Sequence, residues 1–238
     1  MRWLIAEYQP VALFSLKHGE ATSTGGKSLL LPTPFSIRMA LLDAAIRTMG
    51  LGPEDSAWMD VVGGIRSLSL AVNPPKHAAV TSLFAKVLKP ARDKPGQAFQ
   101  KTIAFREYVH LHGTVGLAFS GAQEALDAVE SLLPHVTYFG KRGSFFQLLN
   151  RPRYEETDSA PPEGFVLLEG WTGGGLPDEF SLGTIQRMDD WGPGVTPGSL
   201  NIYSSEKLSL GKGRIRFDVV LPYHIKQSGR GFTFYERF

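Results

Sequence analysis

The stretch LPTPFSIRMALLDAAIRTMG, residues 31–50, decides the fold class of this chain. Its apolar side chains recur at the three- and four-residue spacing of a helix: Phe35, Met39, Leu42 and Ile46. Thr33 can cap the first turn, Pro34 suits the first helical position, and Gly50 suits the end. The sequence therefore predicts a helix over residues 34–49.

Strand-like segments surround this helix in a definite order. Buried strands combine apolar, β-branched and aromatic residues, and half-buried strands alternate apolar with polar residues. Over residues 1–140 we predict a strand at 2–16, helices at 34–49 and 54–62, a strand at 65–72, a strand at 102–111 that continues over 114–119, a helix at 122–133 and a strand at 136–140. Apart from the short helix 54–62, this is the βαββαβ order of the ferredoxin-like fold, which the RNA-recognition module shares.

The second half of the chain has a different composition. Residues 150–238 are rich in Gly and Pro, with short strand candidates at 164–171, 181–188, 200–210 and 214–221. We therefore predict an α+β protein with an RRM-like domain at 1–150 and a β-rich part at 151–238. The domain at 1–150 includes an insertion at 74–101.

Composition excludes several classes of protein. The 238 residues include no Cys, which excludes disulfide scaffolds, thiolate zinc sites and cysteine nucleophiles. No apolar run approaches the roughly 20 residues of a membrane span. The first ten residues lack the features of a signal peptide. These features predict a soluble cytoplasmic protein with no membrane partner.

The charge is nearly balanced overall but unevenly distributed. Between Pro74 and Arg106, seven Lys and Arg residues face Asp93 alone, which gives 7 − 1 = +6. Between Pro152 and Asp190 the balance reverses. A basic segment on a neutral protein fits either a local anionic partner or a solvated face.

Two possible enzyme motifs are incomplete. Residues 21–28, ATSTGGKS, resemble a P-loop, but a P-loop must lead straight into a helix, and here the helix is predicted to begin only at Pro34. The six His residues lack a spaced acidic partner for a metal site, and no G-x-S-x-G occurs. We expect no metal, no cofactor and no catalytic residue. A nucleotide-binding enzyme built on Gly26-Lys27-Ser28 remains a distant alternative.

The run YFGKRGSFF, residues 138–146, combines glycines, cations and aromatics. Glycines allow close approach of a backbone to a ligand, Lys and Arg suit phosphates, and aromatic faces stack bases. A basic turn followed by a core strand explains the same residues equally well.

Together these features resemble the Cas-five family of CRISPR-associated proteins, the RAMP-type subunits of type I Cascade complexes. Three places carry the resemblance. They are the Gly/Ser/Thr loop leading into Leu31–Ser36 and its small-residue helix, the segment 138–145, and the basic insertion at 74–101 where the family has its thumb. The resemblance covers residues 1–150.

The resemblance implies a non-enzymatic subunit in CRISPR antiviral defence that caps the 5′ handle of the guide RNA. Its implied partners are the guide RNA, the backbone RAMP subunit, the large subunit of Cascade and, indirectly, target DNA. The residues expected at the RNA are Lys17, His18, Lys27, Lys141, Arg142, Ser144 and Phe145. Those expected in the thumb, against RNA or a neighbouring subunit, are Lys86, Lys89, Arg92, Lys94 and Lys101.

One alternative within the same superfamily is an endoribonuclease that cleaves precursor RNA. Metal-free cleavage needs a base near the 2′-hydroxyl and a group that stabilises the phosphate. Tyr8, Lys17 and His18 could in principle form such a cluster. Gly211–Arg214 or Ser228–Gly231 could serve as the Gly-rich loop that such enzymes carry, but residues 150–200 show no amphipathic helix for a second βαββαβ unit.

Overall fold

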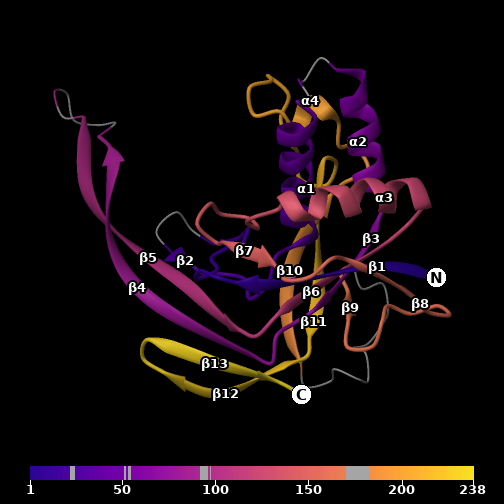
Figure 1. The fold of residues 1–238 in the computed structure, drawn as a ribbon. Coiled ribbons are helices and arrows are strands. Elements are labelled where there is room, and N and C mark those ends of the chain that lie inside the picture. The colour runs from indigo at the N-terminus through magenta and orange to yellow at the C-terminus, as the bar shows by residue number, and fades with distance from the viewer. Residues whose placement is uncertain (22–24, 51, 53–54, 92–95, 97, 170–182) are drawn as a thin grey trace.

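The computed structural model describes residues 1–238 except 22–24, 51, 53–54, 92–95, 97 and 170–182 (Figure 1). The chain is a mixed α+β protein, as predicted. Its helices are α1 (Pro34–Met49), α2 (Ser56–Arg66), α3 (Gln123–Leu132), the 3₁₀ turn η1 (Leu133–His135) and α4 (Pro197–Leu200). Its strands are β1 (Arg2–Pro10), β2 (Gly25–Gly26), β3 (Ser69–Asn73), β4 (His77–Pro90), β5 (Phe99–His112), β6 (Val115–Ser120), β7 (Phe146–Leu148), β8 (Arg153–Glu156), β9 (Val166–Leu167), β10 (Thr184–Trp191), β11 (Arg214–Leu221), β12 (Tyr223–Gly229) and β13 (Phe232–Arg237).

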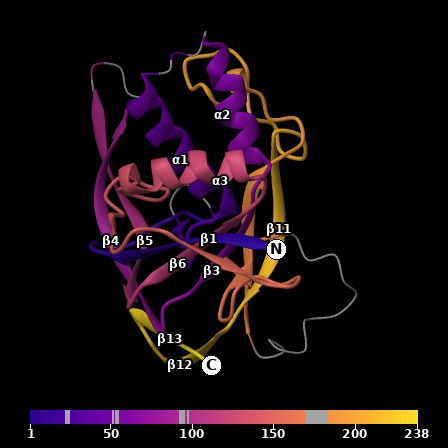
Figure 2. The ribbon, with the colours of Figure 1, turned by 45° about the vertical axis from the view of Figure 1, so that its right-hand side comes forward.

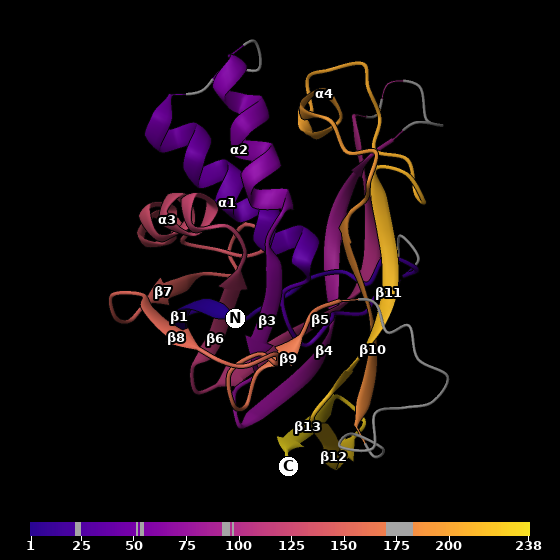
Figure 3. The same ribbon diagram turned by 90° about the vertical axis from the view of Figure 1, so that its right-hand side faces the viewer.

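The first sheet has the strand order β7-β1-β6-β3-β9, and β8 also pairs with β1. Every pairing in it is antiparallel. The helices α1, α2 and α3 lie together on one side of this sheet (Figures 1 and 3). All six residues of β6 are buried, because the strand is central in the sheet.

The boundaries of α1 agree with the prediction at both ends. The Thr33 side chain accepts a hydrogen bond from the Ser36 amide, and Gly50 ends the helix with φ 65°. In contrast, α2 does not end before Gly63-Gly64 but continues to Arg66. Its buried residues Trp58, Val62 and Ile65 form a helical stripe that extends past the two glycines. Packing of that stripe outweighs the low helix propensity of glycine.

The basic insertion is a long β-hairpin. β4 and β5 have 14 residues each and pair from His77↔His112 to Pro90↔Phe99. The hairpin, here called the arm, curves away from the body (Figures 1 and 2). Its base is part of the core through Ala78, Val80, Val109 and Leu111. The predicted strand 102–111 is therefore one side of the arm.

Two strand predictions in the first half are wrong. The strand predicted at 2–16 ends at Pro10, because its later residues turn to the edge of β5, where Phe14 bridges Val109. Residues 136–140 form no strand, because the chain turns at Gly140, which has φ 70°. The strand that pairs with β1 there is β7, six residues beyond that turn.

The C-terminal strands join elements from the first half. β8 and β9 extend the first sheet, and β13 pairs with β4 at the base of the arm. β10 and β11 form a separate antiparallel pair against α1, which we call the C-terminal hairpin and which is distinct from the β12–β13 hairpin. Residues 200–210 comprise the end of α4, turns and irregular chain rather than the predicted strand, since a capping box at Thr196 and Ser199 starts α4 just before them. The predicted division of the chain into domains at residues 1–150 and 151–238 stays a prediction.

A buried ion pair fixes the C-terminal hairpin to the helices. The Arg38 Nε of α1 lies 2.7 Å from the Asp190 Oδ1 of β10. The same guanidinium donates hydrogen bonds to the carbonyl of Ile65 in the last turn of α2 and to that of Leu68 just beyond the helix. Asp190 therefore balances the charge of Arg38 from 152 residues away in sequence.

Among the described helices, none is long and apolar enough to span a bilayer.

Candidate nucleic-acid interface

The two basic loops singled out in the sequence lie side by side. The Ser15 amide donates to Ser144 Oγ at 3.1 Å, and the Val11 amide donates to the Phe145 carbonyl at 3.0 Å. A Cβ on Gly140 would lie 2.8 Å from Leu16 Cδ1. The turn at 138–146 is thus packed directly on the loop that follows β1.

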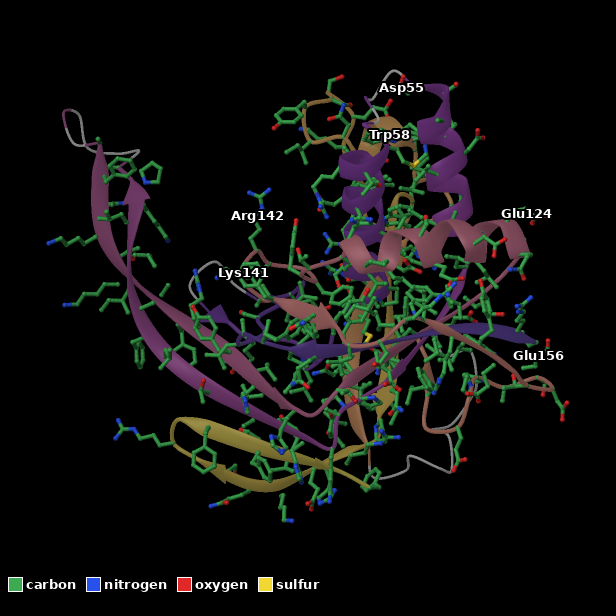
Figure 4. All side chains as sticks on the ribbon, in the orientation of Figure 1. Asp55, Trp58, Glu124, Lys141, Arg142 and Glu156 are labelled. Atoms are coloured by element: carbon green, nitrogen blue, oxygen red, sulfur yellow. The ribbon has the colours of Figure 1, made fainter. Side chains whose placement is uncertain are left out.

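This contact gathers exposed cations on one side of the body. Lys17, Lys27, Lys141 and Arg142 are all exposed, and His18 is half-buried among them. The labelled Lys141 and Arg142 lie on the side nearer the arm, whereas Glu124 and Glu156 lie at the opposite side of the molecule, away from the arm (Figure 4). Lysine and arginine side chains in this arrangement suit a phosphate backbone.

The loops also reach the arm. The Lys141 Nζ lies 5.8 Å from the centroid of the Tyr108 ring on β5, within the range of a cation–π contact. The Ser15 hydroxyl donates to the Glu107 carbonyl on the same strand. The cations are therefore held at the junction of the body and the arm.

Ser144 and Phe145 have different environments. Ser144 is only 2% exposed, and its hydroxyl accepts from the Ser15 amide. This hydroxyl therefore joins the two loops, and the RNA contact expected of Ser144 stays a prediction. Phe145 is 48% exposed, so its ring is available for stacking.

The arm carries a surface of alternating cations and apolar groups. Paired residues on neighbouring strands share a face, and Lys86 pairs with Ile103 as Leu88 pairs with Lys101. The arm face, as we name it, consists of Phe84, Lys86, Leu88, Phe99, Lys101 and Ile103, all of them exposed. Lys89 pairs with Gln100 on the opposite face. Arg92 and Lys94 lie outside the described residues.

The sequence analysis missed three arginines of the C-terminal hairpin. Arg187 lies on β10, and Arg214 and Arg216 lie on β11. Together with the loop at 16–20 they line a cavity of about 410 Å³. The two-residue spacing of Arg214 and Arg216 was a visible signal, because it places both side chains on one face of a strand. The contact of Arg216 with Gly19 of the first loop spans 197 residues and leaves no such signal.

Ion pairs clamp the first loop to this hairpin. Arg187 contacts Glu20 at 2.7 Å and Asp218 at 2.9 Å. Hydrogen bonds from its guanidinium hold the pKa of both carboxyl groups below their ordinary values. Arg216 donates to the Gly19 carbonyl at 3.2 Å. The clamp fixes the backbone next to Lys17 and His18.

The described part of the P-loop-like segment, residues 21 and 25–28, does not have the geometry of a phosphate cradle. Gly25-Gly26 form β2, which pairs in parallel with β5. The Ser28 amide donates to the Glu107 carboxylate at 2.9 Å, and the helix begins only at Pro34, as predicted. A carboxylate at this amide occupies a donor that a phosphate would need.

The residues considered for RNA cleavage differ in their exposure to solvent, so they do not form one accessible cluster. Tyr8 is fully buried and donates to the Leu133 carbonyl at 2.8 Å. Burial raises the pKa of its phenol far above the ordinary value. Lys17 is exposed. The Gly-rich segments 211–214 and 228–231 are a turn before β11 and the tip of the β12–β13 hairpin.

The described residues contain no group of three or more His, Asp or Glu arranged to hold a metal. His110 and His112, two apart on β5, have ring centroids 6.3 Å apart, and His77 lies 5.9 Å from His112. His77 instead contacts Glu236 of β13 at 3.1 Å.

Comparison with known proteins finds one similar curated protein. No protein-family model matches the chain. The curated protein named CRISPR-associated protein Cas5, from Archaeoglobus fulgidus, is 28% identical over 145 residues. The match covers 60% of this chain and spans 61% of that relative. This relative confirms the resemblance to the Cas-five family seen in the sequence motifs.

Similar solved structures also come from CRISPR systems. One is a CRISPR RNA-guided surveillance complex, with a TM-score of 0.41 and 16% identity over 63% of each chain. Another is a CRISPR protein from Archaeoglobus fulgidus, with a TM-score of 0.42 and 10% identity, covering 100% of this chain and 92% of that one. TM-scores below 0.5 do not establish a shared fold.

Proposed function

We propose that this protein binds the 5′ handle of a CRISPR guide RNA as a non-enzymatic subunit of a Cascade-type complex in antiviral defence. The observation that carries this proposal is the packing of two basic loops, remote in sequence, into one surface beside the arm. Four exposed cations on that surface suit phosphates, and Phe145 adds an exposed ring for a base. The similar curated protein, named CRISPR-associated protein Cas5, supports a role in CRISPR defence.

The sheet order supports a ferredoxin-like reading of the core. In β7-β1-β6-β3, the first strand lies between the third and the fourth, and the second strand lies beyond the third. The helices α1 and α2 connect β1 to β3, and α3 connects β6 to β7. We infer that these elements are the βαββαβ unit, with α2 and the arm as insertions.

The arm face supports a role in assembly. Phe84 is 78% exposed and Ile103 is 59% exposed, although both lie in long, regular strands. Exposed apolar groups in such a position mark an interaction surface. We infer that the arm contacts the backbone RAMP subunit and the RNA, while the body contacts the large subunit and so reaches target DNA indirectly.

RNA cleavage by the chain itself is not part of this proposal. The buried phenol of Tyr8 cannot reach a scissile phosphate next to the exposed Lys17. We infer that the protein holds RNA in the cytoplasm and leaves its bonds intact. Metal-independent cleavage of repeat RNA by the purified full chain would contradict this inference.

The direct test is RNA binding by the double variant Lys141→Ala/Arg142→Ala. Removing two phosphate contacts should lower the affinity for a synthetic 5′-handle RNA about tenfold or more. It should also reduce the slope of log K against log salt by about 1.4, since each contact on a single strand contributes about 0.7.

The matched control is Arg66→Ala/Lys207→Ala, which removes the same charge from exposed residues at the end of α2 and after α4. This control should bind RNA nearly as the wild type does. Equal losses in both variants would reduce the effect to net charge and contradict the assignment of the loops.

A further inference from the structure

The cavity between the first loop and the C-terminal hairpin has walls from four parts of the chain. They are the loop at 16–20, the first three turns of α1, the turn at Tyr138–Gly140, and the strands β10 and β11. Its volume of about 410 Å³ is within the usual range of small-molecule sites. Its lining includes the exposed Lys17 and the half-buried His18, so it reaches the solvent beside these cations of the proposed RNA surface.

One wall is a stacked pair that is already fixed in place. The Arg214 guanidinium lies 4.4 Å from the centroid of the Phe35 ring. Two nitrogens of the same guanidinium donate to the Asp189 carboxylate, which pins its plane. Guanidinium and aromatic planes are the surfaces on which unpaired RNA bases stack. Because Asp189 balances its charge, Arg214 suits the flat face of a base better than a phosphate.

The cations near the opening have a different chemistry. Lys17 and Arg216 are exposed, and the hydrogen bond of Arg216 goes to a neutral carbonyl, that of Gly19. Arg216 therefore keeps its positive charge available, whereas Arg214 and Arg187 are paired with carboxylates. The cavity thus has a stacking wall within it and positive charge near its opening.

We propose that this cavity holds one unstacked nucleotide of the bound RNA. The base lies against the Arg214–Phe35 pair, and its phosphate lies near Lys17 and Arg216. The inference rests on the proposed RNA-binding function and adds to it a single-nucleotide subsite, part of which comes from the C-terminal hairpin. The contribution of Arg214 ties this hairpin to RNA recognition as well as to packing.

The test is an abasic scan with the full-length protein. The probes are a synthetic 5′-handle RNA and versions of it that each lack one base. Stacking of one base contributes about 1–3 kcal/mol, so loss of the base in the cavity should weaken binding roughly 5- to 150-fold at one position. Other positions should change less.

Two variants connect that position to the cavity. Phe35→Leu keeps an apolar side chain next to the core, and Arg214→Lys keeps the charge but removes the plane. In both, intact RNA should bind more weakly, and the penalty for the missing base should fall below about twofold. The control Lys141→Ala/Arg142→Ala should weaken all probes while keeping the penalty at that position.

The possible outcomes separate the two proposals. Failure of the wild type to bind intact RNA would overturn the proposed function and this inference with it. Binding of intact RNA with equal affinity for every abasic probe would overturn the cavity alone, as would an unchanged penalty in both variants. Tight binding of free AMP or GMP, with no effect of the abasic positions, would also overturn it.

Discussion

The centre of the first sheet and the arm are both built from regular antiparallel strands but have opposite surroundings. β6 and most of β1 are buried among the helices and neighbouring strands. β4 and β5 are longer and equally regular, yet their outer halves are exposed on the arm face. Regular strands thus form in both places, but burial depends on what packs against them.

The difference also separates stability from function. Side chains of the sheet centre contribute to folding because their apolar area leaves water on folding. Those of the arm face stay in water, so their apolar area gains nothing until a partner covers it. Substitutions in the two regions should therefore affect different measurements.

The largest effect is expected where the core contains a charge. Replacing Arg38 by Met leaves Asp190 without its partner in a buried site, which should cost about 3–5 kcal/mol of unfolding free energy. The matched control, Arg47→Met, breaks an exposed pair with Asp43 and should cost under about 0.5 kcal/mol. Urea denaturation measures both. Equal costs would contradict the difference between buried and exposed surroundings.

The turn that bears Lys141 offers the next effect. Gly140 and Gly143 both have positive φ, so an alanine at either should cost roughly 1–2 kcal/mol in strain. Only at Gly140 would the new Cβ meet Leu16, whereas nothing lies within 4 Å at Gly143. Gly140→Ala should therefore also displace the first loop and lower RNA affinity severalfold. Equal RNA affinities of the two variants would show that the contact between the loops does not matter for binding.

Substitutions in the arm face should weaken assembly and leave stability unchanged, in contrast to the replacement of Arg38. Phe84→Ser and Ile103→Ser should change the unfolding free energy by less than about 0.5 kcal/mol, because both side chains are already exposed. Each should weaken assembly with the backbone subunit about tenfold, measured by titration of the purified partner. Val87→Ser, on the opposite face beside Thr102, is the control. Normal assembly of both arm-face variants would exclude the arm face as the docking surface.

The smallest effect is expected from the clamp on the first loop. Hydrogen bonds from Arg187 lower the pKa of Glu20 and Asp218 from their ordinary values of 4.5 and 3.8. Because the folded-state pKa values are depressed, the stabilisation is present above about pH 4.5 and is lost as the pH falls through them. Melting temperatures from pH 6 to 3 should converge for wild type and Arg187→Gln. A constant difference would contradict the ionic clamp.

Local signals account for what the sequence predicted well. Thr33, Pro34 and Gly50 mark both ends of α1, and the structure places the helix between them. The fourth strand was misplaced because only three residues of β7 pair, too few for a period to appear. The cavity wall could not be predicted, because Phe35 and Arg214 meet only through the packing of the C-terminal hairpin on α1.

The most direct measurement is the identity of any RNA that remains bound when the full-length protein is purified together with its neighbouring gene products. We predict short RNAs that share one repeat-derived 5′ end, with loss of that RNA in Lys141→Ala/Arg142→Ala. Nucleic-acid-free protein at both low and moderate salt, or RNA without a common 5′ end, would contradict the central claim that this surface caps a guide RNA.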